Sequence, residues 1–161
     1  MEQIKYIIKE RTEKIVFPKN LGFGQIFTDH IFEMDYSKDK GWHNPTIKPI
    51  ENIQMHPAMS VIHYGQSIFE GLKAFKTIND EVVIFCPDVH IASLNNSARS
   101  ICMPDVYVDF SLEALKELVA IDSDWIPVNR GEALYIRPFM FGTDPALGVR
   151  PSFDYKLVFL L

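Results

Sequence analysis

An arginine stands inside an aromatic and aliphatic run, ALYIRPFMF, at residues 133–141. Successive side chains of a β-strand point to opposite faces. One face of this strand would carry Tyr135, Arg137, Phe139 and Phe141, and the other would carry Leu134, Ile136 and Met140. The guanidinium of Arg137 cannot lose its charge, so it needs an anionic or aromatic partner. The partner is either one of the 21 acidic residues or the carboxylate of a ligand, which a guanidinium binds through two parallel hydrogen bonds.

A second segment, YGQSIFEGLKAFKT at residues 64–77, mixes tyrosine, glutamate and glycine with apolar residues. Tyr64 fits two interpretations: a core tyrosine whose hydroxyl reaches the surface, or a pocket residue whose hydroxyl contacts a ligand from an apolar wall. Glu70 could act as a general acid or base, but the sequence places no second titratable residue beside it. We therefore favour a structural ion pair for Glu70.

The composition excludes several classes of function. The formal net charge is −5 and no block is rich in lysine or arginine, so neither nucleic acid nor an anionic membrane is an expected partner. The five histidines have no metal-ligand spacing, and no metal site is expected. The common motifs of serine hydrolases, dinucleotide-binding folds and phosphate-binding loops are absent.

The chain has no sign of a targeting or membrane segment. Its first residues carry a charge every few positions, and no apolar stretch approaches the ~18 residues of a membrane helix. We expect a cytoplasmic protein that forms one compact unit, residues 1–161. Cys86 and Cys102 lack a C-x-x-C partner and are expected to be buried, reduced thiols.

The hydrophobic pattern predicts an α+β fold. Period-two segments indicate strands at residues 3–9, 30–36, 72–76, 81–86 and 133–141, with a loop at 37–45. Helical spacing predicts a helix at 87–104 that begins with Pro87, and a second helix with Ser111 as its N-cap. Pro138 lacks an N–H, which implies an edge strand or a bulge. These elements predict an antiparallel-rich sheet with helices packed on one side.

The last segment, DYKLVFLL at residues 154–161, is an apolar strand that stops without a turn or a charged tail. It fits either a C-terminal strand of the sheet or a chain that is cut between two domains. We favour the second interpretation.

Four segments in order carry a resemblance to a known family: FGQIFTDHIFEMDY, KGWHNPTIKPIENIQMHPAMSVIHYGQSIFEGLKAFK, LNNSARSICMP and DWIPVNRGEALYIRPFMFGTDPALGV. The chain resembles branched-chain amino acid aminotransferases, which are pyridoxal 5'-phosphate enzymes of fold type IV. The succession of FEGLKAF, YIRP and FGTDPALGV makes the match specific, and it covers nearly the whole chain. The resemblance implies the N-terminal small domain of such an enzyme, with the cofactor lysine in a C-terminal domain outside these residues.

The resemblance also implies roles for individual residues. Tyr64 would line the pocket for the substrate side chain, and Tyr135 and Arg137 would contact the substrate carboxylate. Phe23 would form another pocket wall. Val149 would enter the site of a neighbouring subunit, which implies a homodimer. The substrates would be leucine, isoleucine or valine together with 2-oxoglutarate, selected by burial of apolar surface.

Two departures from the family pattern are visible. The Schiff-base lysine of the family lies beyond residue 161, so the chain alone is expected to be inactive and not to retain pyridoxal 5'-phosphate. Ser93 stands at the cofactor-binding position where the family has a phosphate-binding arginine, and a serine offers one neutral hydrogen bond in place of a guanidinium. Ser100 likewise replaces another common arginine.

Two other hypotheses stand beside the transaminase. The first is a non-catalytic remnant of the small domain that acts as a binding or assembly module, which the loss of the arginine at position 93 favours. The second keeps the enzyme but changes its substrate to another amino acid or its reaction to lyase chemistry. The presence of Tyr64, Tyr135 and Arg137 favours the transaminase.

Overall fold

The chain forms eight strands, three α-helices and one 3-10 turn. The computed structural model describes residues 1–161. The strands are β1 (Lys5–Tyr6), β2 (His30–Ser37), β3 (Gly41–Pro49), β4 (Ser67–Phe69), β5 (Leu72–Lys76), β6 (Val82–Ile84), β7 (Leu134–Gly142) and β8 (Asp154–Leu160). The helices are α1 (Ser60–Tyr64), α2 (Pro87–Ser100) and α3 (Val108–Ile121), followed by η1 (Ser123–Trp125). The strand predicted at residues 3–9 is therefore reduced to the two residues of β1.

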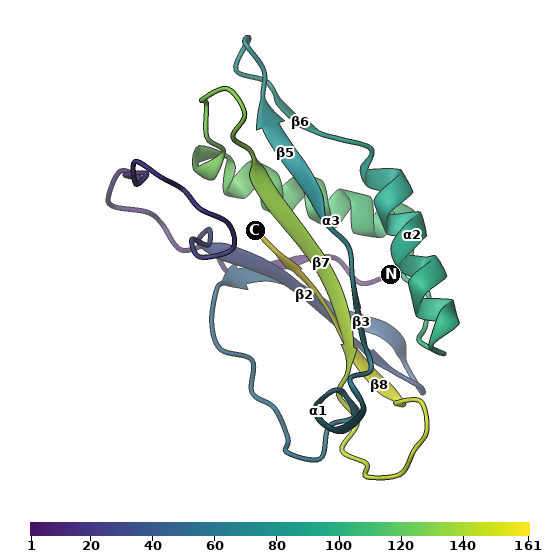
Figure 1. Cartoon of the computed structure of the whole chain (residues 1–161). Helices are drawn as coiled ribbons and strands as arrows, with labels where there is room; N and C mark the ends of the chain where they lie inside the picture. Colours follow the sequence, from purple (N-terminus) through teal and green to yellow (C-terminus); the bar gives the residue numbers. More distant parts are fainter.

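One curled sheet holds all the strands, and α2 and α3 lie along one of its faces (Figure 1). The hydrogen-bonded order is β1-β3-β2-β8-β7-β5-β6, and β4 also pairs with β7. Every pair is antiparallel except β1 with β3. The predicted α+β class, with an antiparallel-rich sheet and helices packed on one side, is confirmed. The segment at 154–161 provides β8, which lies between β2 and β7.

Strand β7 lies in the interior of the sheet, so the predicted edge position for Pro138 is wrong. The carbonyl of Pro138 accepts a hydrogen bond from the backbone N–H of Glu70 (2.9 Å). In an antiparallel pair the N–H and C=O of one residue face the same neighbour, so the missing N–H of Pro138 also faces this segment. There β4 has ended at Phe69 and β5 begins only at Leu72. This interruption of the neighbouring strand accommodates the proline.

Part of the predicted loop at residues 37–45 is a strand. The turn covers only residues 38–40, and β3 begins at Gly41, whose φ of 69° suits a tight hairpin turn. Trp42 then enters the core, where its indole N–H donates to the carbonyl of Asp105 (2.8 Å). The polar residues that follow Trp42 break the alternation of apolar and polar side chains, so the sequence pattern alone does not predict this strand.

Helix α2 begins at Pro87, as predicted, and the restricted φ of proline suits a first helical turn. It buries Ile91, Leu94 and Ala98 completely. The helix ends at Ser100 and not at residue 104, because the chain turns back over the following residues. These buried residues fix α2 against the sheet.

Helix α3 begins at Val108, so the prediction of Ser111 as its N-cap is wrong. The N–H of Ser111 donates to the carbonyl of Tyr107 (2.9 Å), which is the helical pattern. Ser111 is fully buried, and its hydroxyl has no hydrogen-bond partner. Leu115 and Val119 lie on the buried side of α3.

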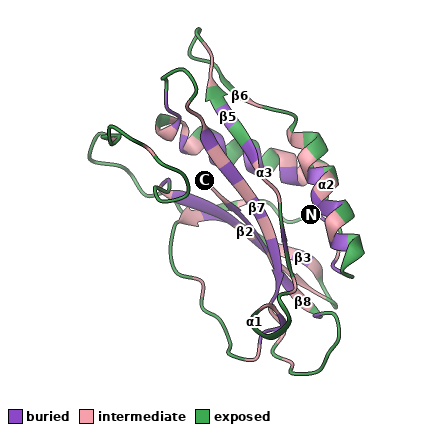
Figure 2. Ribbon diagram, viewed as in Figure 1, coloured by how far each residue is buried: buried purple, intermediate pink, exposed green.

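The core lies between the sheet and the two long helices, and Figure 2 shows the buried residues along the strands and the helix sides that face them. The residues Leu134, Ile136 and Met140 of β7 belong to this core, as their alternation predicted. Both cysteines are exposed, so their predicted burial is wrong. Cys86 and Cys102 flank α2 in tight turns with positive φ, outside the core. None of the helices has the length and apolarity that a membrane crossing requires.

A buried histidine joins the N-terminal segment to the end of α3. His30 and Asp122 are 3% and 2% exposed, and Nδ1 of His30 lies 2.7 Å from Oδ1 of Asp122. The backbone N–H of His30 donates to the other carboxylate oxygen (2.9 Å). Nε2 of His30 accepts the backbone N–H of Lys9 (3.0 Å), so the ring proton is on Nδ1 and is donated to Asp122. The imidazole thus connects three separate segments of the chain.

Replacing Asp122 by alanine should lower the free energy of unfolding by about 3 kcal/mol, because two N–H groups of His30 would be left buried without an acceptor. Urea denaturation followed by circular dichroism measures the loss as a lower midpoint with an unchanged slope. Asp124, which is exposed and two residues away, provides the control Asp124→Ala, which should unfold like the wild type. Equal midpoints for both variants would contradict the prediction.

Candidate functional site

Tyr135 and Arg137 lie on the sheet face that the helices leave open. The Tyr135 hydroxyl accepts hydrogen bonds from Nε (3.2 Å) and Nη2 (3.0 Å) of Arg137. No carboxylate of the chain forms an ion pair with Arg137. The interpretation of Arg137 as an internal ion pair is therefore wrong. The remaining N–H groups of the guanidinium are available to an anionic ligand.

Aromatic rings hold the guanidinium in place without neutralising it. The carbon centre of the guanidinium lies 4.3 Å from the ring centroid of Phe69 and 5.3 Å from that of Tyr135. The negative faces of aromatic rings attract a cation at such distances. Phe69 reaches this position because it pairs directly with Phe139 of β7. The guanidinium keeps its full charge and a fixed place.

Gly71 leaves the space that the Tyr135 hydroxyl occupies. A Cβ atom built on Gly71 would lie 2.3 Å from the hydroxyl oxygen of Tyr135 and 3.0 Å from the adjacent ring carbon. Both distances are shorter than a van der Waals contact, so any larger side chain at position 71 would displace the phenol. The requirement for glycine here is one of space and not of backbone conformation.

An apolar cavity of about 520 Å³ opens beside this pair. Arg137 is the only lining residue with a charged side chain, and the lining comes from the N-terminal segment, η1 and the residues after it, strand β7, and the end of β8 with Leu161. Its main apolar members are Phe17, Leu21, Phe23, Ile26, Phe27, Trp125, Leu134, Leu160 and Leu161. The Phe23 ring meets the Tyr135 ring edge-on at 4.9 Å between centroids. One cation in an apolar hollow suits a ligand with one anionic group and an apolar body.

Tyr64 and Val149 lie outside this cavity. Tyr64 is at the end of α1, where its hydroxyl donates to the carbonyl of Leu147. Val149 is 89% exposed in the loop between β7 and β8. The structure therefore brings together Phe23, Tyr135 and Arg137 but does not bring the other two predicted site residues to them. The roles predicted for Tyr64 and Val149 stay predictions.

Ionic and polar contacts hold the loop that Tyr64 contacts. Asp144 forms an ion pair with Arg150 (2.6 Å), whose guanidinium also lies 3.9 Å from the ring centroid of Phe153. Burial, with the nearby charges of Asp144 and Asp39, raises the pKa of Asp154 at the start of β8. Burial also raises the pKa of the Tyr155 hydroxyl next to it. Neither group faces the cavity.

The carboxylate of Glu70 lies on the α2 side of the β4–β5 junction. The Ser93 hydroxyl donates to one of its oxygens (2.5 Å), and Nδ1 of His90 lies 3.1 Å from the other. All three side chains are partly buried. This agrees with the structural role that the sequence favoured for Glu70.

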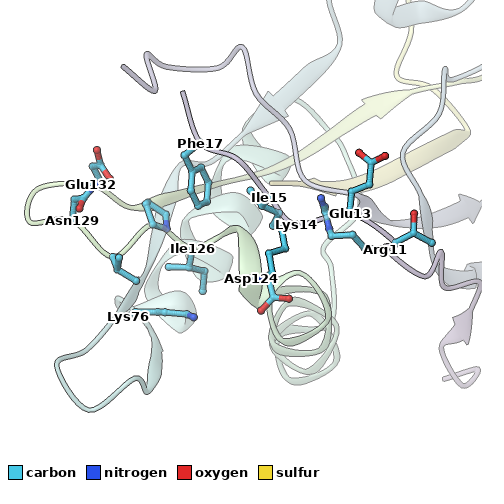
Figure 3. Close-up of a pocket in the computed structure, with 13 residues that line it drawn as sticks. Arg11, Glu13, Lys14, Ile15, Phe17, Lys76, Asp124, Ile126, Asn129 and Glu132 are labelled. Carbon is cyan, nitrogen blue, oxygen red and sulfur yellow. Dashed lines mark hydrogen bonds between the residues drawn. The ribbon is translucent and has the colours of Figure 1, made fainter. Parts of the chain in front are cut away.

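A second pocket, of about 530 Å³, lies between residues 11–17 and residues 124–132 (Figure 3). Its walls carry charged side chains of both signs, among them Lys14, Lys76, Asp124 and Glu132. Lys76 forms an ion pair with Asp80, so it is not a free cation. This pocket lacks the combination of one unpaired charge and apolar walls that marks the first.

Comparison with known proteins relates the sequence and the fold of the chain to one family. The chain is 46% identical over 160 residues to the probable branched-chain-amino-acid aminotransferase of Staphylococcus epidermidis, covering 99% of the chain and 44% of that protein. It is 50% identical over 144 residues to branched-chain-amino-acid aminotransferase 2 of Bacillus subtilis, covering 89% of the chain and 40% of that protein. The chain belongs to the branched-chain aminotransferase family. No protein-family model matches it.

The fold of this chain matches one part of a branched-chain aminotransferase structure. The T.th. branched-chain amino acid aminotransferase, solved with N-(5'-phosphopyridoxyl)-L-glutamate, superposes with a TM-score of 0.63 at 26% identity. The superposition covers 84% of this chain and 41% of that one. The chain thus spans less than half the length of the curated relatives and of the solved structure that it matches.

The cofactor of branched-chain aminotransferases carries a phosphate, and Ser93 does not fit this group. Its single hydroxyl proton is donated to Glu70, so no donor remains for a phosphate oxygen. A phosphate at this point would also meet the carboxylate of Glu70, and like charges repel. The expectation that Ser93 takes part in cofactor binding therefore has no support in its contacts.

The sequence did not assign two residues that complete this part of a branched-chain aminotransferase. Phe69 and Gly71 stand in the quoted FEG motif, but only the three-dimensional pairing shows that one stacks on Arg137 and the other makes room for Tyr135. The two C-terminal leucines of the cavity wall were assigned only to a strand. The signal that could have found Phe69 is its place two residues before Gly71 in the FEG motif.

Replacing Gly71 by alanine should move the phenol of Tyr135 and break its two hydrogen bonds to Arg137, because the new methyl group overlaps the hydroxyl. The near-ultraviolet circular dichroism of the tyrosines should change. Gly148→Ala is the control, since a Cβ there meets no atom within 4 Å. The double variant with Tyr135→Phe should relieve part of the overlap, and a spectrum of Gly71→Ala equal to that of the wild type would refute the close contact.

Proposed function

We propose that this chain supplies the substrate-binding half of a branched-chain amino acid transaminase. The whole protein would move an amino group between leucine, isoleucine or valine and 2-oxoglutarate. Pyridoxal 5'-phosphate would supply the electron-accepting chemistry of the reaction, bound by residues outside this chain. The protein would act in the cytoplasm as a homodimer, with Val149 reaching the neighbouring subunit's site.

The proposal rests on the surroundings of Arg137. It is a permanent cation with no acidic partner, hydrogen-bonded to Tyr135 at the edge of an apolar cavity. A guanidinium held in this way binds a carboxylate through charge-assisted hydrogen bonds. Its position is fixed before the ligand arrives, which lowers the entropic cost of binding.

The apolar walls would select the substrate side chain. Phe23 and its apolar neighbours offer no hydrogen-bond partner to a polar side chain, while each buried methylene group of a ligand contributes about 0.8 kcal/mol. Leucine, isoleucine and valine combine a carboxylate with an apolar branched side chain. In this proposal the residues of the chain bind and orient the substrate and exclude water from its side chain.

Tyr64 would take part from the other end of the sheet. Its ring is about half exposed, and the hydrogen bond from its hydroxyl to Leu147 ties α1 to the loop that carries Val149. We propose that this arrangement presents Tyr64 and Val149 together as an apolar surface for substrate contacts, Val149 in the neighbouring subunit. Leu147, which is 66% exposed, lies in the same loop.

A second candidate function is a non-catalytic binding or assembly module. One observation favours it: the hydroxyl of Ser93 is bonded to Glu70, so this chain offers no phosphate contact at that position. Such a module would keep the ligand cavity without the reaction.

The carboxylate proposal predicts binding of 4-methylvaleric acid, a branched acid that the T.th. enzyme binds in a solved structure. Titration followed by nuclear magnetic resonance should give a dissociation constant that rises at least about tenfold in Arg137→Ala, because a charge-assisted pair is lost. Arg130→Ala removes an exposed arginine outside the cavity and should bind like the wild type. The uncharged amide of the ligand should bind weakly to all three proteins. An Arg137→Ala variant with unchanged affinity would overturn the carboxylate proposal.

The isolated chain should not catalyse transamination. With leucine, 2-oxoglutarate and added pyridoxal 5'-phosphate, glutamate formation should equal that of an enzyme-free control, because the chain provides no lysine matched to the cofactor. The Bacillus subtilis relative serves as the positive control. Turnover by these 161 residues above background would contradict the assignment of the lysine to another part of the protein.

A further inference from the structure

Phe69 and Gly71 contact the Tyr135–Arg137 pair, and with Glu70 between them they form the junction where the regular strand pairing with β7 is interrupted. Phe69 stacks on the guanidinium, and Gly71 leaves room for the phenol. Between them, the N–H of Glu70 donates to Pro138, which has no N–H to donate in return. The regular pairing of β4 ends at Phe69 and that of β5 begins at Leu72. The junction therefore has one backbone hydrogen bond to β7 where a continuous strand would have more.

The side chain of Glu70 supplies a second attachment for this junction. One carboxylate oxygen accepts the Ser93 hydroxyl at 2.5 Å, and the other contacts Nδ1 of His90 at 3.1 Å. Because both oxygens are engaged from two sides, the carboxylate has a defined orientation. His90 and Ser93 are three residues apart, so they lie on one side of α2.

Helix α2 is a firm support for this attachment. Its residues Ile91, Leu94 and Ala98 are completely buried in the core. A side chain that is hydrogen-bonded to α2 is therefore tied to the close-packed core. The hydrogen bonds of Glu70 thus link the core to Phe69 and Gly71, the residues on either side of Glu70.

We propose that Glu70 and Ser93 are positioning residues for the Tyr135–Arg137 carboxylate anchor. Ser93 acts through Glu70: its hydroxyl fixes the carboxylate, the carboxylate fixes the junction, and the junction places Phe69 and Gly71 against the anchor. This inference rests on the proposed function only in its claim about substrate binding. It gives Ser93 a role in this chain that is separate from the cofactor phosphate, for which it has no free donor.

The test uses the 161-residue chain and 4-methylvaleric acid as the probe. Two quantities are measured by nuclear magnetic resonance: the dissociation constant, and the Nε–H signal of Arg137 without ligand, which reports its hydrogen bond to Tyr135. Ser93→Ala should shift or broaden this signal and weaken binding about fivefold, because only part of the free energy of a hydrogen bond to a charged group is transmitted through Glu70 to the anchor. Ser93→Thr keeps the hydroxyl and should restore both.

Matched variants separate positioning from a general loss of structure. Ser97→Ala, one helical turn further along α2 at a residue without a side-chain hydrogen bond in the structure, should leave both quantities unchanged. In a Glu70→Ala background the additional effect of Ser93→Ala should vanish, since both residues act through one contact. A Ser93 effect that persists in that background would overturn the inference. So would a Ser93→Ala variant that melts at a lower temperature but keeps the wild-type signal and affinity.

The two proposals fail in different ways. If Arg137→Ala loses the probe while Ser93→Ala leaves the signal and the affinity unchanged, the positioning role is wrong and the carboxylate anchor stands. If Arg137→Ala binds the probe like the wild type, the carboxylate anchor is wrong. In that case the ligand-free Nε–H signal of the Ser93 variants still decides whether Glu70 and Ser93 position Arg137.

Discussion

The candidate site depends on a single positive charge that no acidic residue neutralises and that neutral groups hold in place. Arg137 is oriented by the Tyr135 hydroxyl and by the faces of two aromatic rings, and no carboxylate cancels its charge. Folding usually places an internal acid next to such a cation, because a buried charge without a partner is costly. Here the cost is reduced by partial exposure and by the aromatic faces, and the charge remains available to a ligand.

The sheet topology explains how this arrangement is built. Because β7 is an interior strand, its helix-facing residues are fixed by the core, and the orientation of its other residues follows from the pleat. The interruption between β4 and β5 lies opposite Pro138 of this central strand, and there Phe69 and Gly71 meet the anchor while the N–H of Glu70 donates to the proline carbonyl. A proline that would weaken an ordinary strand is here part of the geometry of the site.

Alternation and composition were sufficient to predict the α+β class, the two faces of β7 and the start of α2. The hairpin at Gly41 was missed because polar residues interrupt its pattern, although Trp42 is buried there. Ser111 has the chemistry of an N-cap, but the apolar residues before it already pack on the core and extend α3 by a turn. The contact between Ser93 and Glu70 joins residues 23 positions apart, which no local pattern can reveal. The same holds for the separation of Tyr64 from the cavity.

The walls of the apolar cavity come from segments that lie far apart in the sequence, among them Phe17 to Thr28 and the pair Leu160 and Leu161. No short stretch of the sequence can form this cavity, because its opposing walls are not neighbours in sequence. Contacts between such distant segments form late, after the entropy of closing a long loop has been overcome. During synthesis these walls can meet only after β8 has emerged and paired between β2 and β7, so the hollow depends on the completed pairing of these strands and cannot be their folding nucleus.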